Sequence, residues 1–255
     1  MIFFFTGTGN SGIVARRLAD ALCEPDPVRI TDAVPLRFAL RPGERVVWVF
    51  PVYSWGVPPV VRRFMRAVRL DGGDAAVHSM VCTCGDDCGL TSAQWRRELR
   101  RRGWHAGCAY SVEMPNTYVS LPGFDVDAPA TVRRKLDAMP ARVAEAARAI
   151  SVGARVDDTV RGSFAWLKTH VIYPFFVRFL MSPRPFRATD GCIGCSICVR
   201  ACPMHNVSLD PATDRPRWGS DCAGCLACYH ACPRHAVAYG SRTARKGQYR
   251  AQRGE

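Results

Sequence analysis

The chain has 255 residues and a formal net charge of +13, with 35 lysines and arginines against 22 acidic residues. Its length is that of two domains rather than one. A strongly basic chain can bind nucleic acid, but the sequence shows no recognised nucleic-acid-binding module, so we expect no nucleic-acid partner.

The first 22 residues, MIFFFTGTGNSGIVARRLADAL, predict a strand, a loop and a helix. A short apolar run covers Ile2 to Phe5, and after the loop apolar side chains return at helical intervals, at Ile13, Val14, Leu18, Ala21 and Leu22. A loop of small hydroxylated residues before a helix can present N–H groups and hydroxyls to an anion, which the helix dipole also favours. We therefore predict a phosphate-binding loop; the alternative is a merely structural turn.

The loop itself, Thr6-Gly7-Thr8-Gly9-Asn10-Ser11, differs from two better-known phosphate loops. It lacks the lysine of nucleoside-triphosphate loops, and Asp32 is poorly placed for the ribose contact of a dinucleotide-binding fold. The loop resembles the T-x-T-G-N-[ST] phosphate loop of flavodoxins, which holds the terminal phosphate of FMN. This resemblance implies that FMN binds and that FAD does not bind well.

Further strand and helix units follow as far as residue 114. The predicted strands are Val46–Phe50, Ala76–Cys82 and a last one ending near Met114. The predicted helices begin at Pro59 and run from about Thr91 to Arg102. Alternating units of this kind indicate an α/β fold with a doubly wound parallel sheet, whose ligands bind at the carboxyl ends of the strands.

The densest basic patch is RRELRRR, residues 96–102. We interpret it mainly as the solvated face of a helix. Its functional alternatives are an acidic redox partner and an anionic lipid surface.

The segment after a predicted helix at 128–151 is rich in apolar residues, twelve of them large, between Phe164 and Met181. Lys168 and Arg178 interrupt the apolar run and leave it too short to span a bilayer. Because a flexible linker would be rich in Gly and Ser, we expect the segment to pack between two domains. The alternative is peripheral membrane contact by a helix lying in the interface.

Eight of the 13 cysteines form two copies of C-x2-C-x2-C-x3-C-P, CIGCSICVRACP at 192–203 and CAGCLACYHACP at 222–233. This is the spacing of [4Fe–4S] ligands in two-cluster ferredoxins, where the fourth cysteine of each run binds the other cluster. We assign one cluster to Cys192, Cys195, Cys198 and Cys232. The second takes Cys222, Cys225, Cys228 and Cys202. Since the first group directly follows the apolar segment, we expect its cluster to be the nearer one to the flavin.

Structural zinc and a disulfide scaffold are the alternatives for these cysteines. Zinc has no use for a third cysteine at the same interval, and disulfides need an oxidising compartment. The first residues show no basic n-region and no cleavage site, so we expect a cytoplasmic protein. The other cysteines, Cys23, Cys82, Cys84, Cys88 and Cys108, fit no metal-binding pattern, and we expect small apolar side chains or free thiols there.

Taken together, these motifs resemble the flavodoxin–ferredoxin fusion proteins of anaerobic bacteria and archaea. The matching pieces are the loop at 6–11, YSWGVPP at 53–59, MPNTY at 114–118, and RWGSDCAGCLACYHACP at 217–233. The resemblance implies a flavodoxin-like FMN domain at 1–155, an apolar helical connector at 156–185, and a small α+β ferredoxin domain with two [4Fe–4S] clusters at 186–240. A basic tail at 241–255 follows.

The same resemblance implies the residues that bind FMN. The phosphate is expected at Thr6, Thr8, Gly9, Asn10 and Ser11. The isoalloxazine ring is expected beside Tyr53, Ser54, Trp55 and Gly56, with Trp55 stacked on it, and beside Thr83, Cys84 and Gly85. The alternative for Trp55 is a half-buried side chain that only plugs the sheet edge. Because the 83–89 loop has no aromatic residue, one face of the flavin is expected to be open or covered by Tyr118 or by the ferredoxin domain.

FMN accepts two electrons and releases them singly, whereas each cluster carries one. We therefore expect an electron-transfer protein that exchanges electrons with a redox partner, possibly an acidic protein. The alternatives are a redox sensor or docking protein, and an FMN-dependent reductase of a small substrate. No catalytic acid–base pair identifies such a substrate, since His78 and His105 fall in predicted strands.

Overall fold

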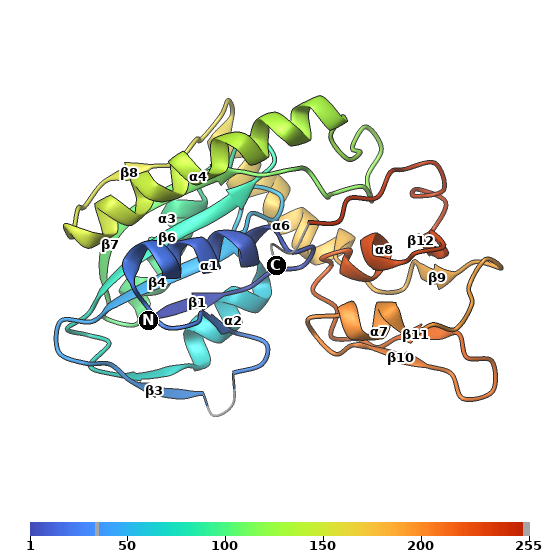
Figure 1. The fold of residues 1–255 in the computed structure, drawn as a ribbon, viewed down its shortest axis with the longest axis horizontal. Helices are drawn as coiled ribbons and strands as arrows, with labels where there is room; N and C mark the ends of the chain where they lie inside the picture. The colour runs from blue at the N-terminus through green and yellow to red at the C-terminus, as the bar shows by residue number, and fades with distance from the viewer. Residues whose placement is uncertain (34–35, 252–255) are drawn as a thin grey trace.

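The computed structural model describes residues 1–33 and 36–251. Its centre is a parallel sheet of six strands in the order β2-β1-β4-β6-β7-β8 (Figure 1). The strands are β1 (Ile2–Phe4), β2 (Val28–Arg29), β4 (Arg45–Pro51), β6 (Val77–Cys84), β7 (His105–Glu113) and β8 (Asp157–Asp158). The first five follow the 2-1-3-4-5 order of flavodoxin-like folds, so the predicted fold class is confirmed.

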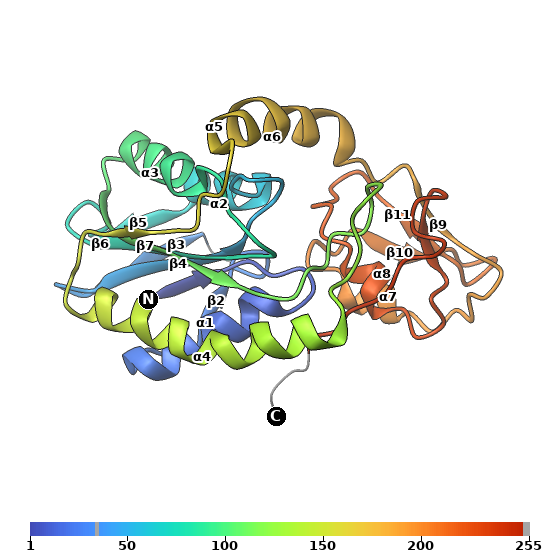
Figure 2. The same ribbon diagram turned by 90° about the horizontal axis from the view of Figure 1, so that it is seen from above.

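Helices cover both faces of this sheet (Figure 2). On one face lie α1 (Asn10–Leu22) and α4 (Pro129–Ser151), and on the other α2 (Pro59–Ala67) and α3 (Thr91–Arg101). Alternate residues of β1 and β4 enter the two cores: Phe3 and Trp48 pack on the α2 and α3 side, whereas Phe4 and Val49 pack on the other. Burial on both faces explains why these strands are apolar throughout.

Three features of this domain differ from the sequence-based expectation. Strand β6 runs to Cys84, two residues beyond the predicted end, because its ladder with β7 continues from Thr83 to Cys84. A separate parallel pair, β3 (Arg37–Ala39) with β5 (Arg69–Asp71), lies outside the main sheet. Strand β8 pairs with β7, so the sheet continues past residue 155 into the segment expected as connector.

The helical part of the connector, labelled α5 and α6 in Figure 2, alternates α- and π-helical turns. These turns are α5 (Ala165–Leu167), η1 (Lys168–Ile172), α6 (Tyr173–Phe175) and η2 (Phe176–Leu180). The Tyr173 hydroxyl donates to the Val57 carbonyl at 2.5 Å, and the Leu180 carbonyl accepts from Tyr239 Oη at 2.9 Å. The connector therefore contacts both domains. None of the helices within 1–33 and 36–251 is both long enough and apolar enough to cross a membrane.

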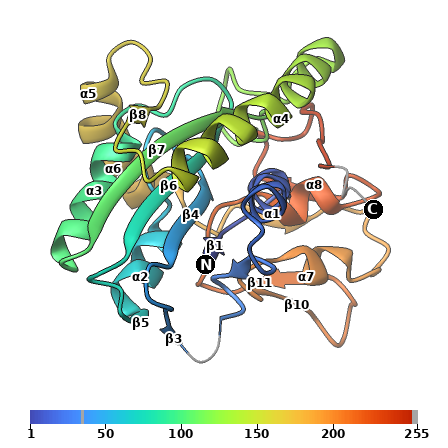
Figure 3. The same cartoon turned by 60° about the vertical axis from the view of Figure 1, so that its left-hand side comes forward.

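The C-terminal domain consists of two antiparallel strand pairs and two short helices beside the carboxyl edge of the large sheet (Figures 1 and 3). The pairs are β9 (Phe186–Ala188) with β12 (Val237–Tyr239) and β10 (Val207–Leu209) with β11 (Pro216–Trp218); the helices are α7 (Ile197–Ala201) and α8 (Ala227–Ala231). Both helices end two residues before a proline, Pro203 and Pro233, which cannot continue a helix.

The segment after β12 folds back on α8. The Tyr229 hydroxyl donates to the Lys246 carbonyl at 2.8 Å, and Gln248 Nε2 donates to the Cys232 carbonyl at 3.0 Å. Residues 252–255, the end of the predicted basic tail, lie outside the described residues.

Candidate functional site

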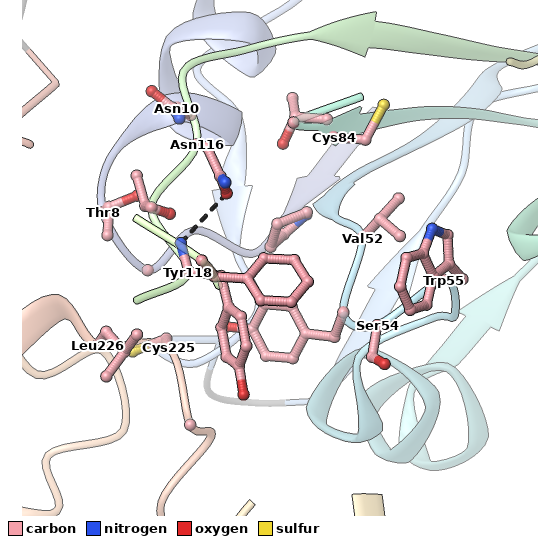
Figure 4. Close-up of a pocket in the computed structure, with 18 of the residues that line it drawn as sticks. Thr8, Asn10, Val52, Ser54, Trp55, Cys84, Asn116, Tyr118, Cys225 and Leu226 are labelled. Atoms are coloured by element: carbon pink, nitrogen blue, oxygen red, sulfur yellow. Dashed lines mark hydrogen bonds between the residues drawn. The ribbon is translucent and has the colours of Figure 1, made fainter. Parts of the chain in front are cut away.

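A cavity of about 360 Å³ lies at the carboxyl edge of the sheet, where the strand order reverses between β1 and β4. This is the place where ligands of such folds bind, and the volume is within the range of small-molecule sites. Figure 4 shows Ser54 and Trp55 on one side, Cys225 and Leu226 on the other, and Tyr118 between them. The walls come from the loops after β1, β4, β6 and β7, from the connector, and from the C-terminal domain.

The loop after β1 forms the polar end of this cavity. Thr6, Thr8, Asn10 and Ser11 line it, whereas Gly9 does not. Asn10 Nδ2 donates to the Pro115 carbonyl at 2.9 Å, and the Ser11 and Thr83 hydroxyls lie 2.8 Å apart. Among the described residues, no side chain caps the start of α1, and its first turn has no acidic residue. The N–H groups there are therefore available to an anion such as a phosphate.

The loop after β4 supplies the next wall. Tyr53, Ser54 and Trp55 line the cavity, whereas Gly56 packs against the Tyr173 ring outside it. Ser54 and Trp55 have positive φ angles of 44° and 63°, a conformation that turns these side chains towards the cavity edge. Lys168 Nζ lies 4.9 Å from the centroid of the Trp55 ring and 2.6 Å from Asp87 Oδ2. One face of Trp55 therefore already has a cation against it.

Aromatic and aliphatic side chains enclose the remaining sides. Thr83, Cys84 and Gly85 also line the cavity, and Tyr118 covers it together with connector residues. Sequence reasoning missed the connector's part, which is supplied by Ile172, Phe175, Phe176 and Leu180. The only sequence signal for it is the apolar excess of that segment. The placement of Tyr118 favours the covered alternative for the flavin face, which stays a prediction.

A buried lysine braces two of the cavity loops. The Lys135 side chain is 1% exposed. Its ammonium donates to the Gly85 carbonyl at 2.6 Å and to Asp127 Oδ2 at 2.7 Å. The same carboxylate oxygen accepts the Asn116 N–H at 2.9 Å. Lys135 therefore ties the loop after β6 to the loop after β7, although neither its carboxylate partner nor its burial is visible in the sequence.

One predicted group of four cysteines lines a single cavity, and the members of the other group lie close enough to shift the pKa of Cys225. Cys192, Cys195, Cys198 and Cys232 surround one small cavity in the C-terminal domain. Burial raises the pKa of Cys198, and the nearby Cys232 and Cys192 raise it further. In the other group burial raises the pKa of Cys225, with further increases from Cys228, Cys222 and Cys202. Each group thus includes the distant cysteine that the crossed assignment requires.

The surroundings of these sulfurs suit thiolates. N–H groups point at them: Asn206 N at Cys202 Sγ (3.3 Å), Ala236 N at Cys232 Sγ (3.1 Å) and Trp218 Nε1 at Cys228 Sγ (3.4 Å). Such bonds help to set cluster potentials. Gly194 and Gly224 have φ angles of +66° and +65°, which only glycine adopts without strain. Within the described residues, no three His, Cys, Asp or Glu side chains converge closely enough to hold a single metal ion.

The expectation that the Cys192 group lies nearer the predicted flavin site is wrong. Cys225, of the other group, lines the cavity. A Cβ added to Gly7 would come within 2.6 Å of Cys225 Cβ, so the two loops touch. The Tyr53 hydroxyl is buried between them without a hydrogen-bond partner among the described residues, and burial together with Cys225 raises the Tyr53 pKa. The connector crosses the cavity before the Cys192 loop begins, so proximity in sequence does not become proximity in space.

The cysteines outside the two motifs form no disulfide among the described residues. Cys82, Cys88 and Cys108 are fully buried among apolar residues, and Cys84 lines the cavity. Cys23 is exposed. The burial of the first four suits small apolar side chains, whereas a free thiol at Cys23 stays a prediction.

The basic patch at 96–102 is organised around its one carboxylate rather than being only a solvated face. Glu98 is 2% exposed and binds Arg62, Arg66 and Arg101 at 2.7–3.0 Å. Burial alone would raise the pKa of Glu98, but the hydrogen bonds from Arg66 and Arg62 outweigh it and lower the pKa to about 2. The patch therefore joins α2 to α3.

Comparisons with known proteins identify part of the chain. Residues 189–237 match the family model of the 4Fe-4S dicluster domain. No curated protein matches the chain. Among solved structures, the Trp repressor binding protein from Bacillus subtilis is 10% identical over 57% of this chain and 96% of that chain, with a TM-score of 0.38. Rubredoxin oxygen:oxidoreductase from the anaerobe Desulfovibrio gigas is 14% identical over 58% of this chain and 35% of that chain, with a TM-score of 0.32. The family match supports iron–sulfur binding by the C-terminal domain.

Proposed function

We propose that this chain is an intracellular electron-transfer protein of the flavodoxin–ferredoxin fusion type. It binds FMN in the cavity and one [4Fe–4S] cluster at each group of four cysteines, and it exchanges electrons with a redox partner. The observation that carries the proposal is that Cys225 and the Thr6–Ser11 loop line the same cavity. Thirteen cysteines without a disulfide among the described residues also suit a reducing compartment.

The residues present fit FMN. The uncapped start of α1 and the hydroxyls of Thr6, Thr8 and Ser11 provide the donors that a phosphate needs. Trp55 and Tyr118 offer aromatic faces to a flat ring, and connector side chains provide an apolar wall beside it. When bound, FMN supplies two-electron chemistry that can be released in single steps.

The packing of the two domains shortens the path between carriers. Cys225, a member of the Cys222 group, lines the cavity together with Tyr53, and Gly7 allows the two loops to touch because it has no Cβ. His230 Nε2 donates to the Thr117 carbonyl at 2.7 Å, which fixes α8 against the loop after β7. Holding the carriers in one body makes their electron exchange intramolecular.

The test is transient kinetics on the full, anaerobically reconstituted chain. After flash photoreduction at the flavin, we expect the cluster absorbance to change at a rate independent of protein concentration. A rate proportional to concentration would refute the proposal. Two variants form a matched pair: Cys225→Ser should remove the fast phase, whereas Cys195→Ser, in the more distant group, should keep it. Steady turnover with small acceptors in the same preparation would favour a reductase over a carrier.

A further inference from the structure

The outer face of the connector is an exposed apolar surface, which we call the apolar stripe. It consists of Phe164, Trp166, Leu167, Val171, Ile172, Phe175 and Phe179. Phe164 is 79% exposed, Trp166 64% and Phe179 61%. Isolated exposed apolar side chains are normal, but a contiguous set of this kind marks an interaction site.

The helical run that carries the apolar stripe is firmly packed against the rest of the protein. The opposite face of the same helical run is anchored by Thr169, Tyr173 and Phe176, all buried. Thr169 Oγ1 donates to the Trp55 carbonyl at 2.9 Å, and Phe176 packs edge-on against Tyr118 with ring centroids 5.5 Å apart. The fold therefore holds the apolar stripe in place and turns it outwards.

The helices beside the apolar stripe are basic. Figure 2 shows α2, α3 and the connector on the same side of the molecule. Helices α2 and α3 together contain seven arginines and one carboxylate, the buried Glu98. Glu98 pairs with three of these arginines and Asp221 with Arg63, while Arg97 and Arg100 of α3 are exposed. Val177 of the connector shares a groove with Arg62, Arg63 and Arg66. Arg178, within the stripe's own helix, lies 5.4 Å from the Phe179 ring.

We propose that the apolar stripe and the arginines of α2 and α3 dock this protein on an anionic lipid bilayer, with the connector lying in the plane of the interface. A helix with bulky apolar residues outwards and cations beside it is the pattern of interfacial membrane helices. Anionic headgroups complement the arginines, and acyl chains complement the aromatic side chains. Because Ile172 and Phe175 also line the cavity, docking sets the cavity beside the bilayer.

The experiment is flotation of the full, cofactor-loaded chain with vesicles of phosphatidylcholine alone or mixed with phosphatidylglycerol. We expect binding to the anionic vesicles only, weakened by salt. Quenching by brominated acyl chains should report insertion of Trp166. Replacing Arg97 and Arg100 by Gln should weaken binding to the anionic vesicles, because both arginines are exposed on α3.

The decisive variant is Phe164→Ser with Phe179→Ser, because neither side chain lines the cavity. Each Phe removed from the acyl region should lower binding about tenfold. The matched control is Val152→Ser with Val160→Ser, two exposed positions outside the stripe, which should bind like the parent chain. The proposal is overturned if the parent chain does not float with anionic vesicles or if the stripe variant binds as well as the control. It is also overturned if the stripe is buried in a dimer of this chain, which light scattering would detect.

Discussion

Replacing Lys135 by Met tests whether a buried ion pair shapes the cavity. The substitution keeps most of the apolar stem but leaves the Gly85 carbonyl and the Asp127 carboxylate without their donor. Breaking a buried pair from one side costs about 3–5 kcal/mol. Since the Asp127 side chain is 17% exposed and water can reach it, we expect the lower end, about 3 kcal/mol.

The loops that Lys135 joins are two walls of the cavity, so flavin binding should weaken as well. Part of the binding energy must then order these loops, and we expect the FMN dissociation constant to rise about tenfold. Urea denaturation of the full chain, followed by circular dichroism, measures the stability. Quenching of flavin fluorescence on titration measures the affinity.

The neighbouring residue on α4 provides a matched control. Arg134 also pairs with a carboxylate, Glu113 at 3.1 Å, but its side chain is 60% exposed. Arg134→Met should leave stability and FMN affinity nearly unchanged, because solvent screens exposed pairs. Adding Asp127→Asn to Lys135→Met should restore part of the loss by removing the unpaired charge. Equal effects of Lys135→Met and Arg134→Met on both measurements would refute the bracing role.

Three further predictions concern the cofactors and the pH dependence. Cys202→Ser should damage the cluster at the 222–228 loop more than the cluster at the 192–198 loop, which electron paramagnetic resonance of the reduced protein measures. Equal loss of both clusters in a folded domain would contradict the crossed assignment. Thr8→Glu should expel FMN by placing a carboxylate at the phosphate position, while Thr8→Ser should retain it, and unchanged flavin content in the first variant would show that the loop has another role. The pKa of Glu98 is lowered from 4.5 to about 2. Its ion pairs therefore contribute up to about 3 kcal/mol to the free energy of unfolding; this contribution is complete above pH 4.5 and is lost as the pH falls towards 2. Urea midpoints should therefore fall less steeply between these pH values for Glu98→Gln than for the parent chain, and identical slopes would contradict this reasoning.

Much of the fold follows from local sequence features. The apolar runs at residues 2–5 and 46–50 became β1 and β4, and Pro59 became the first residue of α2. Each of these features depends on periodicity or on the conformational limits of proline, which act within a few residues. The end of β6 was less predictable, because its last pairs depend on hydrogen bonds to β7.

The candidate site also has a part that the sequence predicts and a part that it does not. The loop at 6–11 could be placed at the sheet edge from its composition and position after a strand. The part played by the connector could not be predicted from the sequence. A helical run of 16 residues from Ala165 to Leu180 that is rich in apolar side chains does not indicate which of them face inwards. Contacts with Trp55, Val57 and Tyr118 decide that Thr169, Tyr173 and Phe176 are buried and that the apolar stripe is not.

By itself the sequence determined the cysteine motifs and the grouping that they predict, because three of the four cysteines in each group lie on one short loop. Only the tertiary structure decided which group lies beside the cavity. Cys192 follows the connector directly, yet Cys225 is the residue that touches Gly7. The physical reason is that cysteine spacing fixes geometry within a loop, whereas the approach of one domain to another is set by complementary surfaces far apart in the chain. The absence of a Cβ at Gly7 and the bond between His230 and Thr117 are parts of such a surface.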